Sequence, residues 1–190
     1  TVNEGGNCTV MNVDVGGGTS KIAIVQKGVV VDTSALEVGA RLVALDASGK
    51  IDRLEDAGVK IGEAAGVSLA LGDGLKESDK EKMAATLCDC LFEVLERGRI
   101  SPLTRSLMLT PEVGFKEPID AVMFSGGVAE YIYGFEKRDL GDLGSHLGQR
   151  VQARAQKLAG KIALKPADVR IRATVIGASQ YTVQVSGNTI

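Results

Sequence analysis

A run of three glycines at positions 16–18 lies between two short segments that are rich in β-branched residues. Residues 9–14 (TVMNVD) before the run and residues 21–26 (KIAIVQ) after it have the composition of strands. Glycine has no Cβ, so consecutive glycines permit a tight turn and let the backbone come close to another group. This part of the chain is therefore predicted to form a β-hairpin with a glycine turn.

The hairpin is predicted to extend into a larger α/β fold. Lys27-Gly28 is a tight-turn signal, and residues 29–34 (VVVDTS) give a third antiparallel strand. Strands then alternate with helices, which predicts a mixed sheet with flanking helices and an antiparallel three-strand meander. The later predicted elements are a hairpin at 42–46 and 50–54, a short helix within 57–77, helices at 78–98 and from 101, a strand at 119–124, a helix at 142–158 and a strand at 170–176.

Local signals mark the ends of the two central helices. Ser78 followed by Glu81 is a capping-box sequence and predicts a helix that begins at Ser78. Gly98 fits the position just after the end of that helix, where a left-handed residue is common. Ser101 and Pro102 fit an N-cap and the first helical position of the next helix.

Charge and composition exclude several classes of function. Lys and Arg number 22 and Asp and Glu 24, so the net charge of −2 predicts neither a nucleic-acid nor a membrane partner. No apolar run reaches the about 20 residues of a membrane-spanning helix. His146 is the only histidine, which excludes a histidine-rich metal site. The three cysteines, Cys8, Cys88 and Cys90, lack CxxC spacing, which disfavours a zinc site or a disulfide framework and suggests a reducing compartment.

The glycine turn has the chemistry of a phosphate cradle. Backbone N–H groups of a glycine turn can approach a phosphate closely, and nearby hydroxyls add donors. An aspartate at the strand end can hold the water shell of a Mg²⁺ ion. The pattern is neither GxxxxGK[ST] nor GxGxxG, and a hairpin of no chemical interest remains the alternative. The candidate residues are Asp14, Gly16, Gly17, Gly18, Thr19 and Ser20, with Asp14 as the metal residue.

A second glycine motif follows the strand predicted at 119–124. Ser125, Gly126, Gly127 and Val128 connect that strand to a predicted helix. Two glycines at a strand-to-helix turn give flat backbone access for the base or sugar of a ligand near a helix N-terminus. A plain tight connection without a ligand is the alternative.

The two motifs, about 110 residues apart and in this order, resemble the second phosphate loop and the adenosine motif of the actin, sugar-kinase and Hsp70 ATPase superfamily. The resemblance implies a ribonuclease H-like lobe of the actin-like ATPase fold, and it implies ATP and Mg²⁺ as cofactors. Glu37-Val38-Gly39-Ala40 resembles a further glycine turn of the Hsp70-like members. Ala40 departs from the Gly-Gly found there, so no ligand contact is assigned to it.

More of the chain is similar to the ethanolamine ammonia-lyase reactivating factors. The similar segments are VDVGGGTSKIAI, LEVGARL, ISPLTRSLM, FSGGVAE, GDLGSHLG and RATVIGA. The resemblance implies an ATP-dependent, chaperone-like reactivase that releases damaged cobalamin from the adenosylcobalamin-dependent lyase. It also implies the lyase as partner, and the bacterial cytoplasm, with a possible ethanolamine-utilisation microcompartment, as location.

The resemblance implies an incomplete ATPase, because a first phosphate loop and a C-terminal segment of the family are missing. Residues 9–190 are expected to be a single nucleotide-binding lobe, the second of two, and residues 1–8 a disordered or linking start. The partner lobe lies outside this chain. We therefore expect little or no hydrolysis from the lobe alone, and no catalytic residue is assigned.

Two other functions stay open at this point. One is another enzyme of the superfamily, such as a small-molecule kinase, although no catalytic Asp in a substrate cleft is marked. The other is a non-catalytic interaction module with a degenerate nucleotide site, and a homo-oligomer is possible.

Several other residues favour structural interpretations. Asp142 and Glu130 are interpreted as charges at helix N-termini, with catalytic acids as the alternative. Cys88 and Cys90 are interpreted as packing residues. His146, without an obvious acid partner, is interpreted as a surface or satisfied core residue, and residues 76–82 as a solvated cap. A basic helix face is interpreted as solvent-facing, with a partner surface as the alternative; it comprises Arg150, Arg154 and Lys157.

Overall fold

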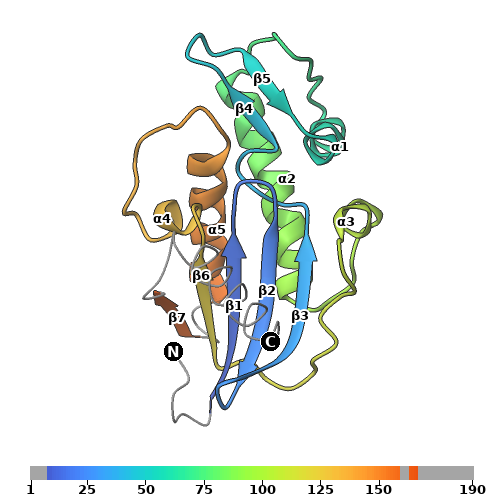
Figure 1. Ribbon diagram of the computed structural model, residues 1–190, viewed down its shortest axis with the longest axis vertical. Helices are drawn as coiled ribbons and strands as arrows, with labels where there is room; N and C mark the ends of the chain where they lie inside the picture. The colour runs from blue at the N-terminus through green and yellow to red at the C-terminus, as the bar shows by residue number, and fades with distance from the viewer. Residues whose placement is uncertain (1–7, 159–162, 167–190) are drawn as a thin grey trace, which may run out of the picture.

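A five-stranded mixed sheet organises the part of the chain that the computed structural model describes, residues 8–158 and 163–166 (Figure 1). The strand order is β3-β2-β1-β6-β7, so the first strand is central. The α/β class with flanking helices is confirmed. The strands of this sheet are β1 (Thr9–Val15), β2 (Ser20–Gln26), β3 (Val29–Leu36), β6 (Ala121–Ser125) and β7 (Ala163–Pro166).

The predicted three-strand meander is confirmed. β1 pairs with β2 antiparallel, with Thr9 opposite Gln26 and Val15 opposite Ser20. β2 pairs with β3 antiparallel, with a bulge after Ile24. Lys27 and Gly28 both have positive φ, +51° and +78°, as a two-residue hairpin turn of this hand requires. The local turn chemistry was therefore sufficient to predict this half of the sheet.

The other half of the sheet is parallel. β6 lies parallel to β1, and β7 lies parallel to β6. β6 begins at Ala121 rather than at the predicted residue 119, and β7 was not predicted. The strand predicted at 170–176 lies outside the described residues, as do residues 1–7 of the disordered or linking start predicted at 1–8.

Helices pack on one face of the sheet and form the main core with it (Figure 1). The two long helices α2 (Glu77–Leu95) and α5 (Gly144–Leu158) contact each other there. Met11 and Val13 of β1 are buried in the same cluster as Leu87 of α2 and Leu147 of α5. Six of the seven residues of β1 are buried, so the strand is covered on both faces although its sequence, TVMNVDV, includes three polar residues.

Small elements stand at the upper end of the sheet as drawn in Figure 1, beyond the turn that joins β1 and β2. The predicted hairpin is present as β4 (Val43–Leu45) and β5 (Ile51–Leu54), and it leads into α1 (Asp56–Ala65). The two short helices are α3 (Pro102–Leu107) and α4 (Ala129–Ile132). No helix in the described ranges has both the length and the apolar composition needed to cross a bilayer.

The predicted ends of α2 were wrong. The helix begins at Glu77 after Lys76, which makes no side-chain cap bond, so Ser78 lies inside the first turn. The helix ends at Leu95, and the left-handed position falls on Arg97 (φ +54°) rather than on Gly98. Arg97 tolerates this conformation because its guanidinium donates to the carbonyls of Phe115 and Glu117. By contrast, the Ser101 cap of α3 is confirmed.

Contacts of α2 bear on two interpretations of charged segments. Arg150 is exposed, as interpreted, and Arg154 is half-buried; both form ion pairs with acidic residues of α2 and the segment just after it. Arg154 also lies over the Phe92 ring, 4.7 Å from its centroid. Within residues 76–82, Lys80 is buried rather than solvated. Cys88 and Cys90 are buried free thiols, which confirms them as packing residues.

Candidate functional site

The two glycine motifs meet at one edge of the sheet. β1 and β6 are parallel neighbours, and Asp14 stands directly beside Ser125 in their register. The backbone N–H of Val128 donates to the carbonyl of Val15 at 3.2 Å. Parallel strands place their carboxyl ends at the same edge, and this is the edge where ligands bind in open α/β sheets. Segments more than 100 residues apart therefore form one site.

Gly126 is required by the closeness of these two segments. Its φ is +86°, and a Cβ built on it would lie 2.3 Å from Asp14 Oδ1 and 2.5 Å from the Val15 carbonyl oxygen. Gly127 differs, because a Cβ at that position would meet nothing within 4 Å. Gly126 thus allows the strands to approach, whereas Gly127 leaves open space beside them.

A third segment, residues 37–41, closes over the first glycine turn. A Cβ built on Gly39 would lie 2.3 Å from the Gly17 carbonyl oxygen, so the two backbones are in contact. The N–H groups of Ala40 and Arg41 donate to the carbonyls of Gly16 and Gly17, at 3.1 and 2.6 Å. In a trans peptide the N–H points opposite to the carbonyl. The N–H groups of the same two peptides, which belong to Gly17 and Gly18, therefore point away from this third segment.

Thr19 and Ser20 are placed differently from each other. Ser20 was expected to offer its hydroxyl to a phosphate, but this hydroxyl is fully buried and donates to the Val38 carbonyl at 2.7 Å. Ser20 therefore supports the turn from the core side. Thr19 is half-buried, and its hydroxyl accepts a hydrogen bond from the Lys21 ammonium at 3.1 Å. Lys21 is a cation next to the turn that the sequence motif did not include.

A cavity of about 240 Å³ lies between the glycine turns and two later segments. Of the predicted site residues, Gly16, Gly17, Gly127 and Val128 line it, and Ala40 does so too. Asp14, Ser125 and Gly126 lie behind this surface at the strand ends. The remaining lining residues come from outside the predicted motifs and are Arg41, Glu130, Tyr131, Glu136, Leu140 and Asp142.

Arg41 places a positive charge over the first glycine turn. Its aliphatic side-chain carbons lie 3.6 Å from the position that a Cβ on Gly17 would take. Its Nε lies 3.9 Å from Asp142 Oδ2, and its side chain is 58% exposed, so it remains accessible to a ligand. An arginine beside backbone N–H groups is a common arrangement for binding phosphate.

Asp142 is a buried carboxylate in the wall of the cavity. It lies two residues before α5 and accepts a hydrogen bond from the Gly144 N–H at 2.7 Å, in agreement with its interpretation as a helix N-terminal charge. Burial raises the pKa of Asp142, against the opposing effects of the Gly144 hydrogen bond and of Arg41. Asp142 is thus both the cap of α5 and the nearest acidic group to Arg41 that the geometry shows.

A second acidic residue of the wall is neutralised within its own loop. The Arg138 side chain hydrogen-bonds to Glu136, and together with the backbone N–H groups of Lys137 and Arg138 it lowers the pKa of Glu136 to about 2. The Tyr131 hydroxyl donates to the Arg138 carbonyl at 2.9 Å. These contacts fix the loop that follows α4, so its charged side chains do not all face the cavity as free charges.

The model of the family described as "Ethanolamine utilisation protein EutA" matches residues 1–190, the whole chain. The chain belongs to the EutA family.

Two bacterial members of the EutA family are similar to the chain over nearly its full length. The "Ethanolamine ammonia-lyase reactivase EutA" of Salmonella typhimurium (strain LT2) is 33% identical over 186 residues, which is 96% of this chain and 39% of that protein. The protein of the same name from Escherichia coli (strain K12) is 29% identical over 193 residues, 100% of this chain and 40% of that protein. The chain thus spans about two fifths of the length of these relatives.

The EutA motifs predicted only part of this site. They contain the two glycine turns, but the loop at 136–142 has no local sequence signal that would connect it to them. Asp142 and Glu130 have the sequence pattern of helix N-terminal charges, and Arg41 directly follows the third glycine turn without belonging to its motif. The charged part of the wall depends on how α5 packs, which is a long-range property.

The EutA site offers oxygen atoms to a cation at the strand ends. Asp14 is largely buried there, and the buried Ser125 hydroxyl has no hydrogen-bond partner among the residues that the structure describes. A buried polar atom of this kind is typical of a place where water or a ligand binds. Within the same described part of the chain, no three metal-ligating side chains gather, so a Mg²⁺ ion held by Asp14 through water stays a prediction.

Proposed function

We propose that this chain is the nucleotide-binding lobe of a reactivase of ethanolamine ammonia-lyase, and that it binds ATP with Mg²⁺. One observation carries the proposal: two glycine turns from distant parts of the sequence meet side by side and line one cavity. A glycine-rich surface lets a phosphate chain lie against backbone N–H groups, which is difficult where side chains intervene.

The topology supports an actin-like ATPase lobe. β2 runs antiparallel to both neighbours, whereas β1, β6 and β7 run parallel in the order β3-β2-β1-β6-β7. A ribonuclease H-like lobe has this arrangement of a meander followed by parallel strands. Its phosphate-binding hairpin would be the β1–β2 turn, and its adenosine turn would follow β6.

The charges around the cavity favour one orientation of the nucleotide. The phosphates would lie by Gly16, Gly17 and Arg41, where the backbone and a guanidinium can both donate. The adenosine would lie by Gly127 and Val128, beside the apolar Leu140 side chain. Mg²⁺, when bound, would neutralise charge on the phosphates. Asp14 would hold the metal through water, and Ser125 would orient one of those waters.

The lyase enters the proposal through the relatives. Both are named reactivases of ethanolamine ammonia-lyase, and both are bacterial. Since the chain spans about two fifths of their length, release of damaged cobalamin and contact with the lyase belong to the whole protein. We place that protein in the bacterial cytoplasm, with a possible association with the ethanolamine-utilisation microcompartment. We expect the lobe alone to bind nucleotide and to hydrolyse it little.

A calorimetric titration with Mg-ADP and Mg-ATP tests nucleotide binding. Gly127→Asp is the decisive variant, because its side chain has open space and places a negative charge in the cavity. We expect saturable binding by the wild-type chain and loss of binding by Gly127→Asp, with both chains folded by circular dichroism. Gly98→Asp is the matched control, since Gly98 also has open space but does not line the cavity. Equal affinity of the Gly127→Asp chain would remove the adenosine assignment.

A further inference from the structure

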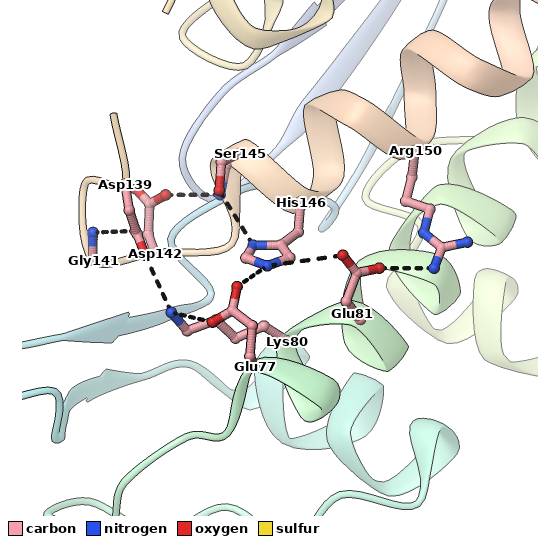
Figure 2. A network of polar contacts seen from close by, with 10 residues as sticks. Glu77, Lys80, Glu81, Asp139, Gly141, Asp142, Ser145, His146 and Arg150 are labelled. Carbon is pink, nitrogen blue, oxygen red and sulfur yellow. Dashed lines mark hydrogen bonds and ion pairs between the residues drawn. The ribbon is translucent and has the colours of Figure 1, made fainter. Parts of the chain in front are cut away.

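A network of charged residues joins the N-terminus of α2 to the loop that forms one wall of the cavity (Figure 2). Lys80 is its centre. The Lys80 ammonium lies 3.3 Å from Glu77 Oε2 and 3.3 Å from Asp139 Oδ2, and the Lys80 side chain is only 8% exposed. Burial alone would lower the pKa of Lys80, but the contacts with Asp139 and Glu77 outweigh it, and the pKa is raised. Lys80 is therefore charged and held by two partners on different segments.

Asp139 connects Lys80 to the turn around Gly141, which belongs to the wall of the cavity. Its Oδ2 bonds Lys80, and its Oδ1 accepts the N–H of Gly141 at 2.8 Å. Gly141 has φ +72°, and a Cβ on it would lie 2.9 Å from the Leu45 carbonyl oxygen, so the loop is pressed against β4. The N–H of Leu45 donates to the Gly141 carbonyl at 2.6 Å. One carboxylate thus connects α2 to a tight turn.

The same turn carries residues of the cavity. Leu140 and Asp142, on either side of Gly141, both line it. Leu143 follows, and its N–H donates to the carbonyl of Ala40 at 2.9 Å, next to Arg41. A shift of the turn would therefore move an apolar wall residue and the carboxylate that lies nearest Arg41.

His146 provides a second connection between α2 and the start of α5. It is a buried histidine with both ring nitrogens bonded, as the satisfied-core interpretation has it, but it does have an acid partner: Nε2 hydrogen-bonds Glu77 Oε1, and Nδ1 is 3.2 Å from the Ser145 hydroxyl. Glu81 lies 4.0 Å from Nε2 and pairs with Arg150 of α5 (Figure 2). The first turn of α5 is thereby fixed to α2 through contacts that share Glu77 with Lys80.

We propose that Lys80 and Asp139 are positioning residues, which hold the wall formed by Leu140 and Asp142 in the arrangement that binds nucleotide. The proposal rests on the proposed function, because it names residues that act on the same cavity without touching the ligand. Lys80 lies on the α2 side of the wall and is not among the residues that line the cavity. Its effect on binding would therefore be transmitted through Asp139 and the turn.

The test compares Lys80→Met with Lys82→Met. Methionine keeps the aliphatic volume of lysine and leaves no buried charge, and Asp139, whose side chain is 51% exposed, stays solvated without its partner. Lys82 is a matched control, because it pairs with Asp79 on the same helix at 3.0 Å and its side chain is 55% exposed. Two quantities are measured: the affinity for Mg-ADP, and the hydrogen-exchange rates of the Leu45 and Leu143 amides without ligand.

We expect Lys80→Met to bind Mg-ADP about threefold to tenfold more weakly and to exchange both amides faster. Lys82→Met should match the wild type in both measurements. Asp139→Asn should reproduce Lys80→Met, and Lys80→Arg, which keeps the charge, should retain most of the affinity. If Lys80 had only a structural role, its replacement would lower stability, but Lys80→Arg and Lys80→Met would not differ in their affinity for Mg-ADP.

The outcomes separate the two proposals. If the wild type binds Mg-ADP and Lys80→Met binds it as tightly as Lys82→Met, the positioning role is wrong while nucleotide binding stands. If the wild type does not bind Mg-ADP, the proposed function fails. The exchange rates then show whether Lys80 holds the turn around Gly141 in place. Faster exchange of the Leu45 and Leu143 amides in Lys80→Met, but not in Lys82→Met, supports this role, and unchanged rates overturn it.

Discussion

Gly126 is the residue at which the two halves of the candidate site touch. Its positive φ and the short distances to Asp14 and Val15 leave no room for a side chain. A glycine between a buried strand and a short helix could have served only the turn, and the sequence motif did not distinguish these roles. The structure shows that the residue serves both, because the turn conformation and the close approach fall on the same position.

Gly126→Ala is expected to lower the free energy of unfolding by about 2 kcal/mol or more, because strained φ and overpacking against the backbone act together. Gly127→Ala, which adds the same methyl group in open space, should change it by less than about 0.5 kcal/mol. Urea unfolding followed by circular dichroism measures both. Similar values for the two variants would mean that the strands separate easily at this point.

Arg41 is expected to contribute to phosphate binding. Arg41→Gln removes the charge over Gly17 and should weaken Mg-ADP binding about tenfold, in the range of a charge-assisted hydrogen bond. Arg53→Gln is the control. Arg53, on β5, is similarly exposed, pairs with Glu55 and does not line the cavity. Calorimetric titration of both variants decides, and equal affinities would exclude Arg41 from the phosphate site.

Among the elements, α5 shows how a glycine inside a helix can be determined by packing. A Cβ on Gly148 would lie 2.3 Å from the Cβ of Tyr131 in α4. Alanine has the higher helix propensity by about 1 kcal/mol, so the sequence alone would favour replacing this glycine. The contact between α4 and α5 overrides that preference, and it holds the helix that follows the second glycine turn against the core.

Gly148→Ala is therefore expected to destabilise the chain by about 1–3 kcal/mol in spite of the gain in propensity. Gln149→Ala, at the exposed neighbouring position, also introduces alanine but makes only a small change in helix propensity and no clash, so it should leave the stability within about 0.5 kcal/mol. Thermal and urea unfolding measure the difference. A stabilised Gly148→Ala variant would show that α4 can move away from α5 at little cost.

Elements with local signals were predictable, and elements fixed by distant contacts were not. The Lys27-Gly28 turn and the Ser101 cap follow from side chain and backbone within a few residues. The start of α2 does not, because Glu77 joins the helix and bonds His146, 69 residues away. The end of α2 is set in a similar way by carbonyls that Arg97 meets about 20 residues later.

For the whole molecule, the candidate site was half predictable. The two glycine turns were found as motifs, and their meeting was implied by resemblance rather than derived from spacing. The wall at 136–142 could not be predicted, because its place depends on the packing of α5 against α2 and on the single ammonium of Lys80. The residues close to 136–142 in the sequence do not by themselves determine where this wall lies.

The stability of the whole molecule should depend on acid through the Lys80 network. The hydrogen bond from Gly141, together with Lys80, lowers the pKa of Asp139 from its ordinary 3.8. Burial raises the pKa of Glu77, but the hydrogen bonds from His146 and Lys80 outweigh burial, so this pKa lies below its ordinary 4.5. A carboxyl whose pKa is lowered in the folded chain adds stability at pH values above its ordinary pKa. This stability is lost as the pH falls through the lower pKa of the folded chain.

We therefore expect the free energy of unfolding of the wild type to fall more steeply below about pH 3.8, the ordinary pKa of Asp139, than that of Asp139→Asn, which lacks this titrating group. The two chains should differ most at neutral pH and converge in acid. Urea unfolding at successive pH values measures both curves. Parallel curves would mean that Asp139 has the same pKa in the folded and unfolded chain.

The parallel pairing of β1 with β6 has a consequence for the order of folding. Asp14 and Ser125 become neighbours only when a loop of about 110 residues closes, and loop closure of this kind is entropically unfavourable until later contacts offset it. The meander can form early from local turns, but it carries only half of the cradle. A chain still emerging from the ribosome would therefore present the first glycine turn long before the second could reach it, so that the proposed nucleotide binding would report the completed fold.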